Sequence, residues 1–217
     1  MSGLTHSDLC GIAVKWLKRA NSAGGPGCHI AVSECRSGWT GEVPDAIGFR
    51  AAGSIDDGSV VVECKTSRSD FLADRKKAHR IDGGCGNWRY FMAPEGIISP
   101  DELPDRWGLL IVNTRGHVKA VSGLAVKYRN SWPRDDDIRA WRHEANRDRE
   151  QFLLTKLLFR VGDPEVLNRN IKIAYAERDQ AVRYAKERIK GLQDELRLAR
   201  KQQTRSQDSP RAMPRQQ

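Results

Sequence analysis

The sequence has no long apolar run, and it does not open with the pattern of a secretory signal. A membrane-spanning helix needs about 20 mostly apolar residues, and no segment of this 217-residue chain approaches that length. A signal peptide combines a basic start with an apolar stretch of about 7–15 residues, and the first residues do not follow this order. We therefore expect a cytoplasmic protein without a membrane partner.

Cysteine and histidine are scarce, and their spacing does not indicate a metal site. The five cysteines are an odd number and include no Cys-x-x-Cys pair, and the five histidines show no ligand spacing. Structural zinc is therefore not expected, and buried reduced thiols are the better interpretation in a cytosolic protein. The sequence also lacks an aromatic signature for stacking RNA bases, which disfavours an RNA-directed enzyme.

Basic residues are in excess, which favours a polyanionic partner. The chain has 37 Lys and Arg against 28 Asp and Glu, a net charge of +9 and a pI of about 9.5. Nucleic acid fits this balance, although an anionic membrane surface would also satisfy it. The length predicts one compact domain with an extension.

Two segments, 45–52 and 59–66, predict neighbouring strands joined by a short connection of Gly, Ser and Asp. Side chains two apart on a strand share a face, so Glu63 and Lys65 point the same way, roughly 6–7 Å apart along the strand. Asp45 could then lie near Glu63 across the pair. An ordinary ion-pair ladder on a strand surface would show the same residues.

Paired carboxylates beside a lysine suit metal-assisted phosphodiester chemistry. Carboxylate oxygens are the ligands that Mg²⁺ prefers, and Mg²⁺ keeps waters that leave room for a substrate phosphate. Lys65 would orient the attacking water and stabilise negative charge in the transition state. Glu34, at the end of an earlier predicted strand, could supply a further ligand or be a solvated strand-end residue, and Glu42 is the competing candidate.

These residues resemble the motifs of the PD-(D/E)XK nuclease superfamily. Pro44 and Asp45 match the first motif, and the triplet Glu63, Cys64, Lys65 matches the second. Residues 62–76, 89–94, 102–104 and 107–110 are also similar to MmcB-like DNA-repair proteins and their phage-borne relatives, within a similarity that spans residues 34–112. The sequence departs from that pattern at Lys77, where an aromatic residue is expected, and at Gly86 and Asn87, which replace an acidic residue.

The resemblance implies an α/β fold, a restriction-endonuclease-like mixed sheet flanked by helices. It implies Mg²⁺ or Mn²⁺ held by Asp45, Glu63, the Cys64 backbone carbonyl and Glu34, with Lys65 assisting the water. The implied function is a metal-dependent DNA nuclease of DNA repair, DNA processing or phage DNA metabolism. The main alternative is a catalytically silent nuclease-fold module that binds DNA or recruits a partner.

A basic segment after the second motif is the candidate nucleic-acid interface. Its members could hold backbone phosphates without reading sequence, or they could form an ordinary solvated helix face. The candidates are Ser67, Arg68, Arg75, Lys76, Lys77 and Arg80.

The pattern along the chain predicts three regions: the nuclease-like domain at 1–130, a helical extension at 131–201 and a disordered basic tail at 202–217. In the first region we expect helices at 7–20 and 69–80 and strands near 28–35, 45–52, 59–66, 88–93, 108–114 and 117–122.

The helical extension is predicted to contain two helices. Asp135, Asp136 and Asp137 suit a helix N-terminus, and that helix should run to about residue 160 before the break at Gly162. The second helix has apolar residues at heptad spacing from Ile171 for about four heptads. This pattern predicts a coiled coil, with a parallel or antiparallel homodimer as a possible partner arrangement, or one amphipathic helix lying on its own domain.

Overall fold

The computed structural model describes residues 4–38, 43–74, 77, 83–128 and 132–207. The chain forms two compact units, Met1–Leu157 and Leu158–Gln217. Glu42 and three of the predicted phosphate-binding residues, Arg75, Lys76 and Arg80, lie outside the described residues. Within the described part, no helix is long and apolar enough to span a membrane.

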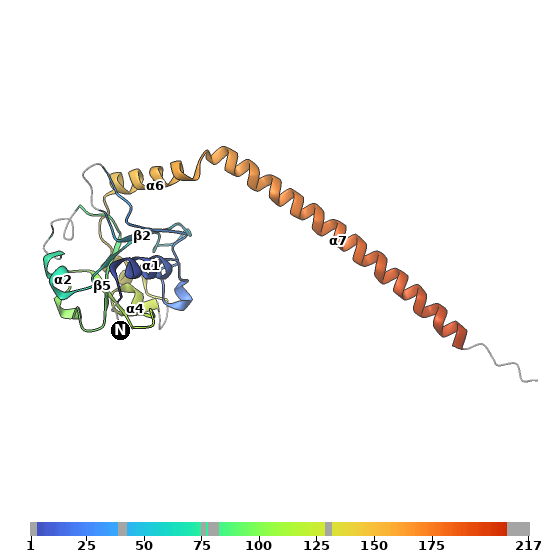
Figure 1. Cartoon of the computed structure of the whole chain (residues 1–217), viewed down its shortest axis with the longest axis horizontal. Helices are drawn as coiled ribbons and strands as arrows, with labels where there is room; N and C mark the ends of the chain where they lie inside the picture. Colours follow the sequence, from blue (N-terminus) through green and yellow to red (C-terminus); the bar gives the residue numbers. More distant parts are fainter. Residues whose placement is uncertain (1–3, 39–42, 75–76, 78–82, 129–131, 208–217) are drawn as a thin grey trace, which may run out of the picture. The chain divides into compact units, whose positions relative to one another are not determined.

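The first unit is built on one six-stranded mixed sheet (Figure 1). The strands lie side by side in the order in which they occur along the chain, β3 runs parallel to β4 and β4 to β5, and the other neighbours are antiparallel. The predicted α/β class with a mixed sheet flanked by helices is therefore confirmed. The strands are β1 (Ile30–Ser33), β2 (Ala46–Arg50), β3 (Gly58–Cys64), β4 (Trp88–Pro94), β5 (Trp107–Val112) and β6 (Val118–Ser122).

Helices cover both faces of this sheet because the inner strands are apolar on both sides, as expected for parallel neighbours. One face packs against α1 (His6–Leu17), α4 (Leu124–Tyr128) and α5 (Asp135–Ala140). The other packs against α2 (Arg68–Asp74) and the first part of α6 (Arg147–Val161). Two short 3₁₀ turns, Asn21–Ala23 and Pro100–Glu102, lie in the connections.

Helix α1 begins at a complete capping box. The Asp8 backbone N–H donates to the Thr5 hydroxyl, and the Thr5 backbone N–H donates to the Asp8 carboxylate at 2.9 Å. Such a cap contributes about 1 kcal/mol to helix stability. The apolar stripe of α1, which includes Leu9 and Trp16, is buried against β1, β2 and β3.

The segment from Trp132 to Leu157 belongs to the compact unit, which extends beyond the expected boundary at residue 130. The single helix predicted here is wrong, because α5 and α6 are separate. Asn146 begins α6 by accepting a hydrogen bond from the Arg149 backbone N–H, and the preceding backbone pairs with the loop before β4. Ile138 and Leu153 are fully buried and fasten the two helices to opposite faces of the sheet.

The second unit consists mainly of α7 (Pro164–Gln207), a continuous helix of 44 residues. At 1.5 Å per residue its length is about 66 Å. It extends beyond the predicted start of the tail at residue 202, and residues 208–217 lie outside the described part. Its apolar residues at heptad spacing are exposed: Ile171, Tyr175, Val182, Ile189, Leu192 and Leu196.

Candidate active site

The antiparallel pairing of β2 with β3 sets the register of the candidate active site. Ala46 lies opposite Val62, so the residue before β2, Asp45, comes beside Glu63 at the end of β3. The Cys64 backbone N–H donates to Asp45 Oδ2 at 2.7 Å. This hydrogen bond holds one oxygen of the Asp45 carboxylate beside the C-terminal end of β3.

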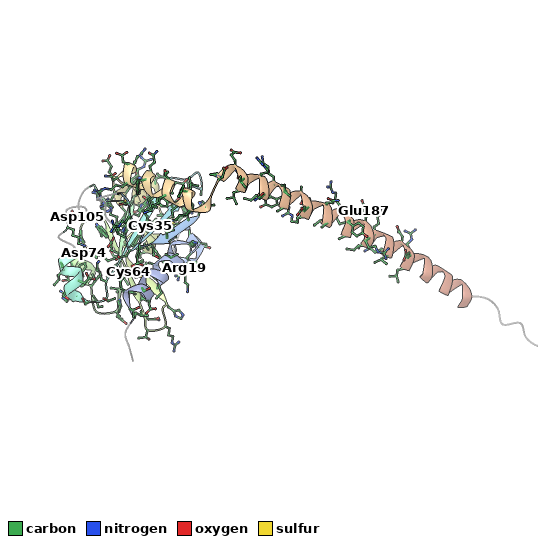
Figure 2. The ribbon with its side chains drawn as sticks, turned by 45° about the horizontal axis from the view of Figure 1, so that its top comes forward. Arg19, Cys35, Cys64, Asp74, Asp105 and Glu187 are labelled. Carbon is green, nitrogen blue, oxygen red and sulfur yellow. The ribbon has the colours of Figure 1, made fainter. Side chains whose placement is uncertain are left out.

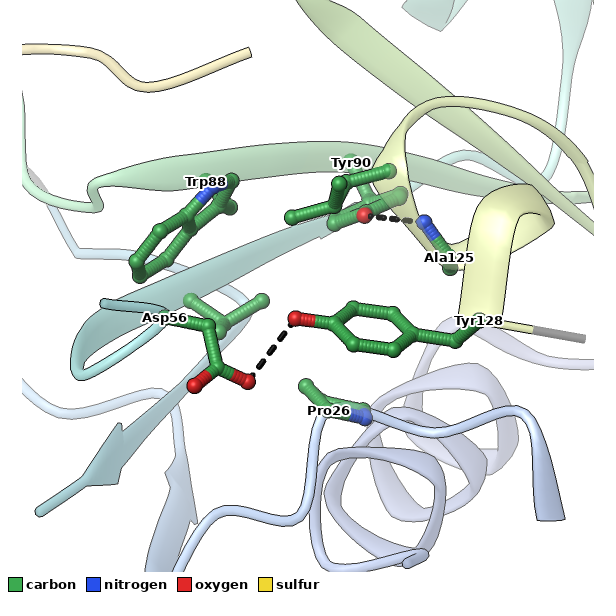
Figure 3. Close-up of a pocket in the computed structure, with 8 residues that line it drawn as sticks. Pro26, Asp56, Trp88, Tyr90, Ala125 and Tyr128 are labelled. Carbon is green, nitrogen blue, oxygen red and sulfur yellow. Dashed lines mark hydrogen bonds between the residues drawn. The ribbon is translucent and has the colours of Figure 1, made fainter. Parts of the chain in front are cut away.

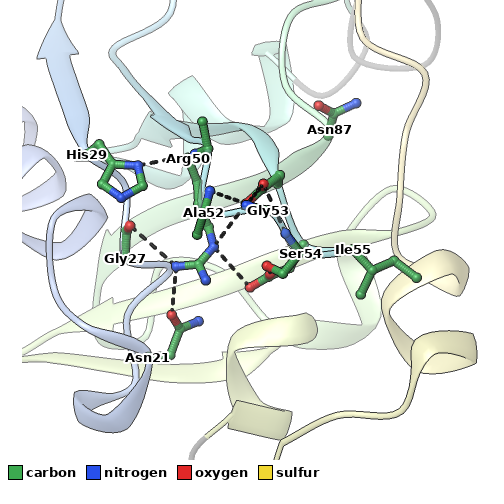
Figure 4. Close-up of polar contacts among 12 residues, drawn as sticks. Asn21, Gly27, His29, Arg50, Ala52, Gly53, Ser54, Ile55 and Asn87 are labelled. Atoms are coloured by element: carbon green, nitrogen blue, oxygen red, sulfur yellow. Dashed lines mark hydrogen bonds and ion pairs between the residues drawn. The ribbon is translucent and has the colours of Figure 1, made fainter.

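A polar network at the β2–β3 turn helps to fix this register (Figure 4). The Asp57 carboxylate accepts hydrogen bonds from the backbone N–H groups of residues 52, 53 and 54. Arg50 Nε lies 3.3 Å from Asp56 Oδ2 and 3.5 Å from Asp57 Oδ1, and its guanidinium also donates to Asn21. The backbone hydrogen bond from Ala52 is the main cause that lowers the pKa of Asp57, which keeps the turn's acceptor ionised.

The same turn is tied to α4 through a small pocket (Figure 3). The Tyr128 hydroxyl donates to Asp56 Oδ2 at 2.8 Å, and the neighbouring Tyr90 hydroxyl accepts from the Ala125 backbone N–H at 3.0 Å. Burial, together with the hydrogen bond to Asp56, raises the pKa of Tyr128 well above its usual range. These two hydrogen bonds therefore connect the turn and β4 to α4, on the face of the sheet opposite Glu63.

Lys65 lies at the centre of the candidate site. Its backbone N–H donates to Met92 O at 2.8 Å and extends the pairing with β4. Its ammonium Nζ lies 3.8 Å from Glu63 Oε2 and 3.9 Å from Asp45 Oδ2. The structure thus brings Asp45, Glu63 and Lys65 together, with only 6% of the Lys65 side chain exposed.

A third carboxylate, that of Asp74, lies at the end of α2 (Figure 2) and completes the surroundings of Lys65. Its Oδ2 lies 3.4 Å from Lys65 Nζ, its Oδ1 lies 2.5 Å from Lys77 Nζ, and the side chain is 1% exposed. Asp74 is not among the site residues that the sequence predicts. Its spacing of three from Phe71 was the available signal, because both then lie on the face of α2 that is buried.

The charges of this cluster favour a cation. Among the described residues, three carboxylates lie within 3.9 Å of the buried Lys65 ammonium group, and Asp74 is also paired with Lys77. These carboxylates lie in a partly dehydrated place, where electrostatic interactions are stronger than in water. The oxygens of Asp45 and Glu63 are hard donors of the kind that Mg²⁺ and Mn²⁺ take.

Cys64 offers such a metal its backbone carbonyl and not its sulfur. A hydrogen bond with Cys10, the burial of the thiol and the nearby charges of Asp45 and Glu63 all raise the pKa of Cys64. The thiol therefore remains protonated.

Glu34 lies next to the site but its side chain is exposed. It follows β1 with a left-handed backbone, φ 50°, and its N–H donates to Asp45 O at 3.1 Å. Among the described residues, the Glu34 carboxylate has no hydrogen bond or ion pair. Its side chain would have to turn toward Asp45 to reach a metal there.

The described members of the basic segment already have partners in the protein. The Ser67 hydroxyl accepts from the Asp70 backbone N–H and caps α2. Arg68 makes a bidentate pair with Glu102, with distances of 2.9 and 2.5 Å. Lys77 is paired with Asp74. DNA phosphates would therefore have to compete with these interactions.

No family model matches this sequence, and no match was found among curated proteins. A protein of unknown function from Silicibacter pomeroyi is similar in structure, with 20% sequence identity and a TM-score of 0.47. The similarity covers 75% of this chain and 94% of that protein. Likeness at this level carries no inference about activity.

Proposed function

We propose that this chain is a metal-dependent DNA nuclease of the PD-(D/E)XK type. The observation that carries the proposal is the meeting of Asp45, Glu63 and Lys65 at the ends of two adjacent strands, with Lys65 Nζ within 3.9 Å of both acids. An ion-pair ladder on a strand surface would be solvated, whereas Glu63 is 2% and Lys65 5% exposed. Burial of this kind is costly and is typical of functional sites.

In the proposed site, Asp45, Glu63 and the Cys64 carbonyl would hold Mg²⁺ or Mn²⁺, with Glu34 as a further candidate. The metal would supply charge neutralisation at the phosphate and a more acidic water. Lys65 would donate to the attacking water or to a phosphate oxygen, which stabilises developing negative charge. Asp74 would hold the ammonium group in position before substrate arrives.

DNA is the proposed substrate because of the net positive charge and the basic residues near the site. We also propose that Ser67, Arg68 and Lys77 bind DNA phosphates. On binding, each would exchange its partner within the protein, described above, for a phosphate oxygen. Roles in DNA repair, DNA processing or phage DNA metabolism follow from the sequence resemblance. A DNA substrate and five cysteines that are all free thiols favour a cytoplasmic location.

The test is cleavage of labelled single-stranded, duplex and branched DNA, with and without Mg²⁺ or Mn²⁺. We expect metal-dependent cutting by the wild type, a loss of at least about 100-fold in Lys65→Ala and Asp45→Asn, and full activity in Lys119→Ala. Lys119 is an exposed lysine on β6 and serves as the matched control. Circular dichroism would verify that each variant is folded.

A folded wild type that binds DNA but cuts none of these substrates would contradict the nuclease proposal. Equal DNA binding by the Lys65 and Asp45 variants would then favour the silent DNA-binding or partner-recruiting module.

We also propose that α7 pairs with α7 of a second copy of this chain. Its exposed apolar seam is sustained for about four heptads, the length over which coiled coils are recognised. Arg178 interrupts the seam, but its guanidinium is paired with Asp179 and stacks over the Tyr175 ring at 5.0 Å. The long side chain can therefore keep its charge at the rim of such a pair.

A further inference from the structure

Helix α1 brings two metal-ligating side chains to Asp45. His6 and Cys10 are four residues apart, so they lie one turn apart on the same face of the helix. Cys10 Sγ lies 3.4 Å from His6 Nε2, and His6 Nε2 lies 3.4 Å from Asp45 Oδ1. The three potential ligand atoms all lie within 4.8 Å of one another.

The two separations that involve His6 Nε2 match the edges of a tetrahedral metal site, and Cys10 Sγ and the Asp45 carboxylate lie within 4.8 Å of each other. With metal–sulfur bonds of about 2.3 Å and metal–nitrogen and metal–oxygen bonds of about 2.0–2.1 Å, tetrahedral angles place sulfur about 3.5 Å from nitrogen and nitrogen about 3.3 Å from oxygen. Both observed separations of 3.4 Å agree with these values. A metal could thus be bound with little movement of His6 relative to its neighbours.

The surroundings fix the three side chains from different sides. The capping box of Thr5 and Asp8 holds the turn that carries His6. Cys10 is 2% exposed and sits where α1 packs on the sheet. Asp45 is held through its other carboxylate oxygen, Oδ2, which accepts from the Cys64 backbone N–H, and an outer donor of this kind supports a metal ligand.

The two oxygens of Asp45 face different neighbours. Oδ1 faces His6, whereas Oδ2 accepts from the Cys64 backbone N–H and lies on the side of Lys65. A metal on Oδ1 would therefore occupy a different place from the Mg²⁺ or Mn²⁺ proposed near Glu63. The Oδ1 side adds sulfur and imidazole nitrogen to one carboxylate oxygen, a donor set that suits Zn²⁺ and not Mg²⁺.

We propose that His6, Cys10 and Asp45 form a binding site for a thiophilic divalent metal ion of the Zn²⁺ class. Three protein ligands leave the fourth position of a tetrahedron to water, and the His6 side chain, 43% exposed, gives solvent access to it. Binding releases the thiol proton of Cys10 to solvent as the metal–sulfur bond forms. The proposal holds whether or not the chain cleaves DNA, because it concerns metal binding alone.

The experiment is titration of the full-length, reduced protein with Co²⁺, which reports thiolate ligation through a charge-transfer absorption band. We expect a tetrahedral Co²⁺ spectrum at one equivalent, displaced by Zn²⁺ and unchanged by a large excess of Mg²⁺. His6→Ala should weaken binding by more than about 10-fold, and Cys10→Ser should abolish the charge-transfer band. Cys85→Ser, a buried cysteine in another part of the core, is the matched control and should keep both.

Three results would overturn the proposal: no charge-transfer band with the folded wild type, a band that persists in Cys10→Ser, or unchanged Co²⁺ affinity in His6→Ala. His6 is exposed, so its variant should fold even if Cys10→Ser does not. Glu63→Gln leaves these three ligands intact and should bind Co²⁺ normally while losing Mg²⁺-dependent cleavage. That variant separates failure of the metal site from failure of the nuclease proposal.

Discussion

Replacing Asp74 with Asn tests how the buried ammonium group of Lys65 is held. The substitution keeps the size of the side chain but removes the charge that lies 3.4 Å from Lys65 Nζ. With an effective dielectric constant of about 20, the attraction at this distance is about 5 kcal/mol before compensation. Lys65 retains Asp45 and Glu63 at 3.9 and 3.8 Å, and repulsion among the carboxylates falls. We therefore expect a net loss of about 1–3 kcal/mol in the free energy of unfolding.

Urea unfolding followed by circular dichroism would measure this change, with Asp70→Asn as the matched control. Asp70 lies on the same helix and is exposed, so its variant should stay within about 0.5 kcal/mol of the wild type. If the two variants were equally stable, the ion pair between Lys65 and Asp74 would not contribute to the stability of the fold. If the chain cleaves DNA, Asp74→Asn should also lower kcat more than it changes KM, because it disturbs the position of Lys65 without removing it.

Three further predictions concern other parts of the molecule. Burial lowers the pKa of His143 to about 4, so the folded protein binds fewer protons than the unfolded chain between pH 4 and about 6.5. The free energy of unfolding should therefore fall as pH drops through this window. Urea unfolding at several pH values would measure this, and His143→Gln should flatten the dependence on pH. Leu153→Ala should cost about 2–5 kcal/mol, whereas Leu158→Ala, at a side chain 55% exposed, should cost less than about 0.5 kcal/mol; equal costs in urea titrations would contradict the place where the compact unit ends. Ile189→Asp should convert a dimer to a monomer in light scattering, whereas Tyr184→Asp, off the heptad seam, should not, and a monomeric wild type would refute pairing through α7.

The sequence could predict the parts of the fold that depend on local pattern. The β-branched run around Val61 identifies a buried strand, and the period of two places Glu63 and Lys65 on one face whatever the rest of the fold does. The short connection before that strand predicts a strand pair in which Asp45 can lie near Glu63, and the polar network at the turn helps to fix the register that places it there. These relations appear in the structure as expected.

Features that depend on tertiary contacts could not be predicted in the same way. From the sequence, Arg68 is predicted to be free to bind phosphate. In the structure it is paired with Glu102, which lies 34 positions later in the chain. The break between α5 and α6 follows from backbone hydrogen bonds to the loop before β4. Such long-range hydrogen bonds cannot be predicted from the helical periodicity of the sequence. His6 and Cys10 had a helical spacing that was visible in the sequence, but only the packing of α1 on the sheet brings Asp45 to them.

The coincidence of spatial and sequential strand order bears on how the protein folds. Each strand pairs with the strand that precedes it in the chain, and β2 and β3 are separated by only a short turn, so their contact closes a small loop at low entropic cost. Asp45 and Glu63 therefore belong to a hairpin that can form early, before the crossover through α2 brings in Asp74. We expect amide hydrogen exchange during refolding to protect β2 and β3 ahead of β4 and β5, so that the acidic pair is assembled before the helix that encloses it.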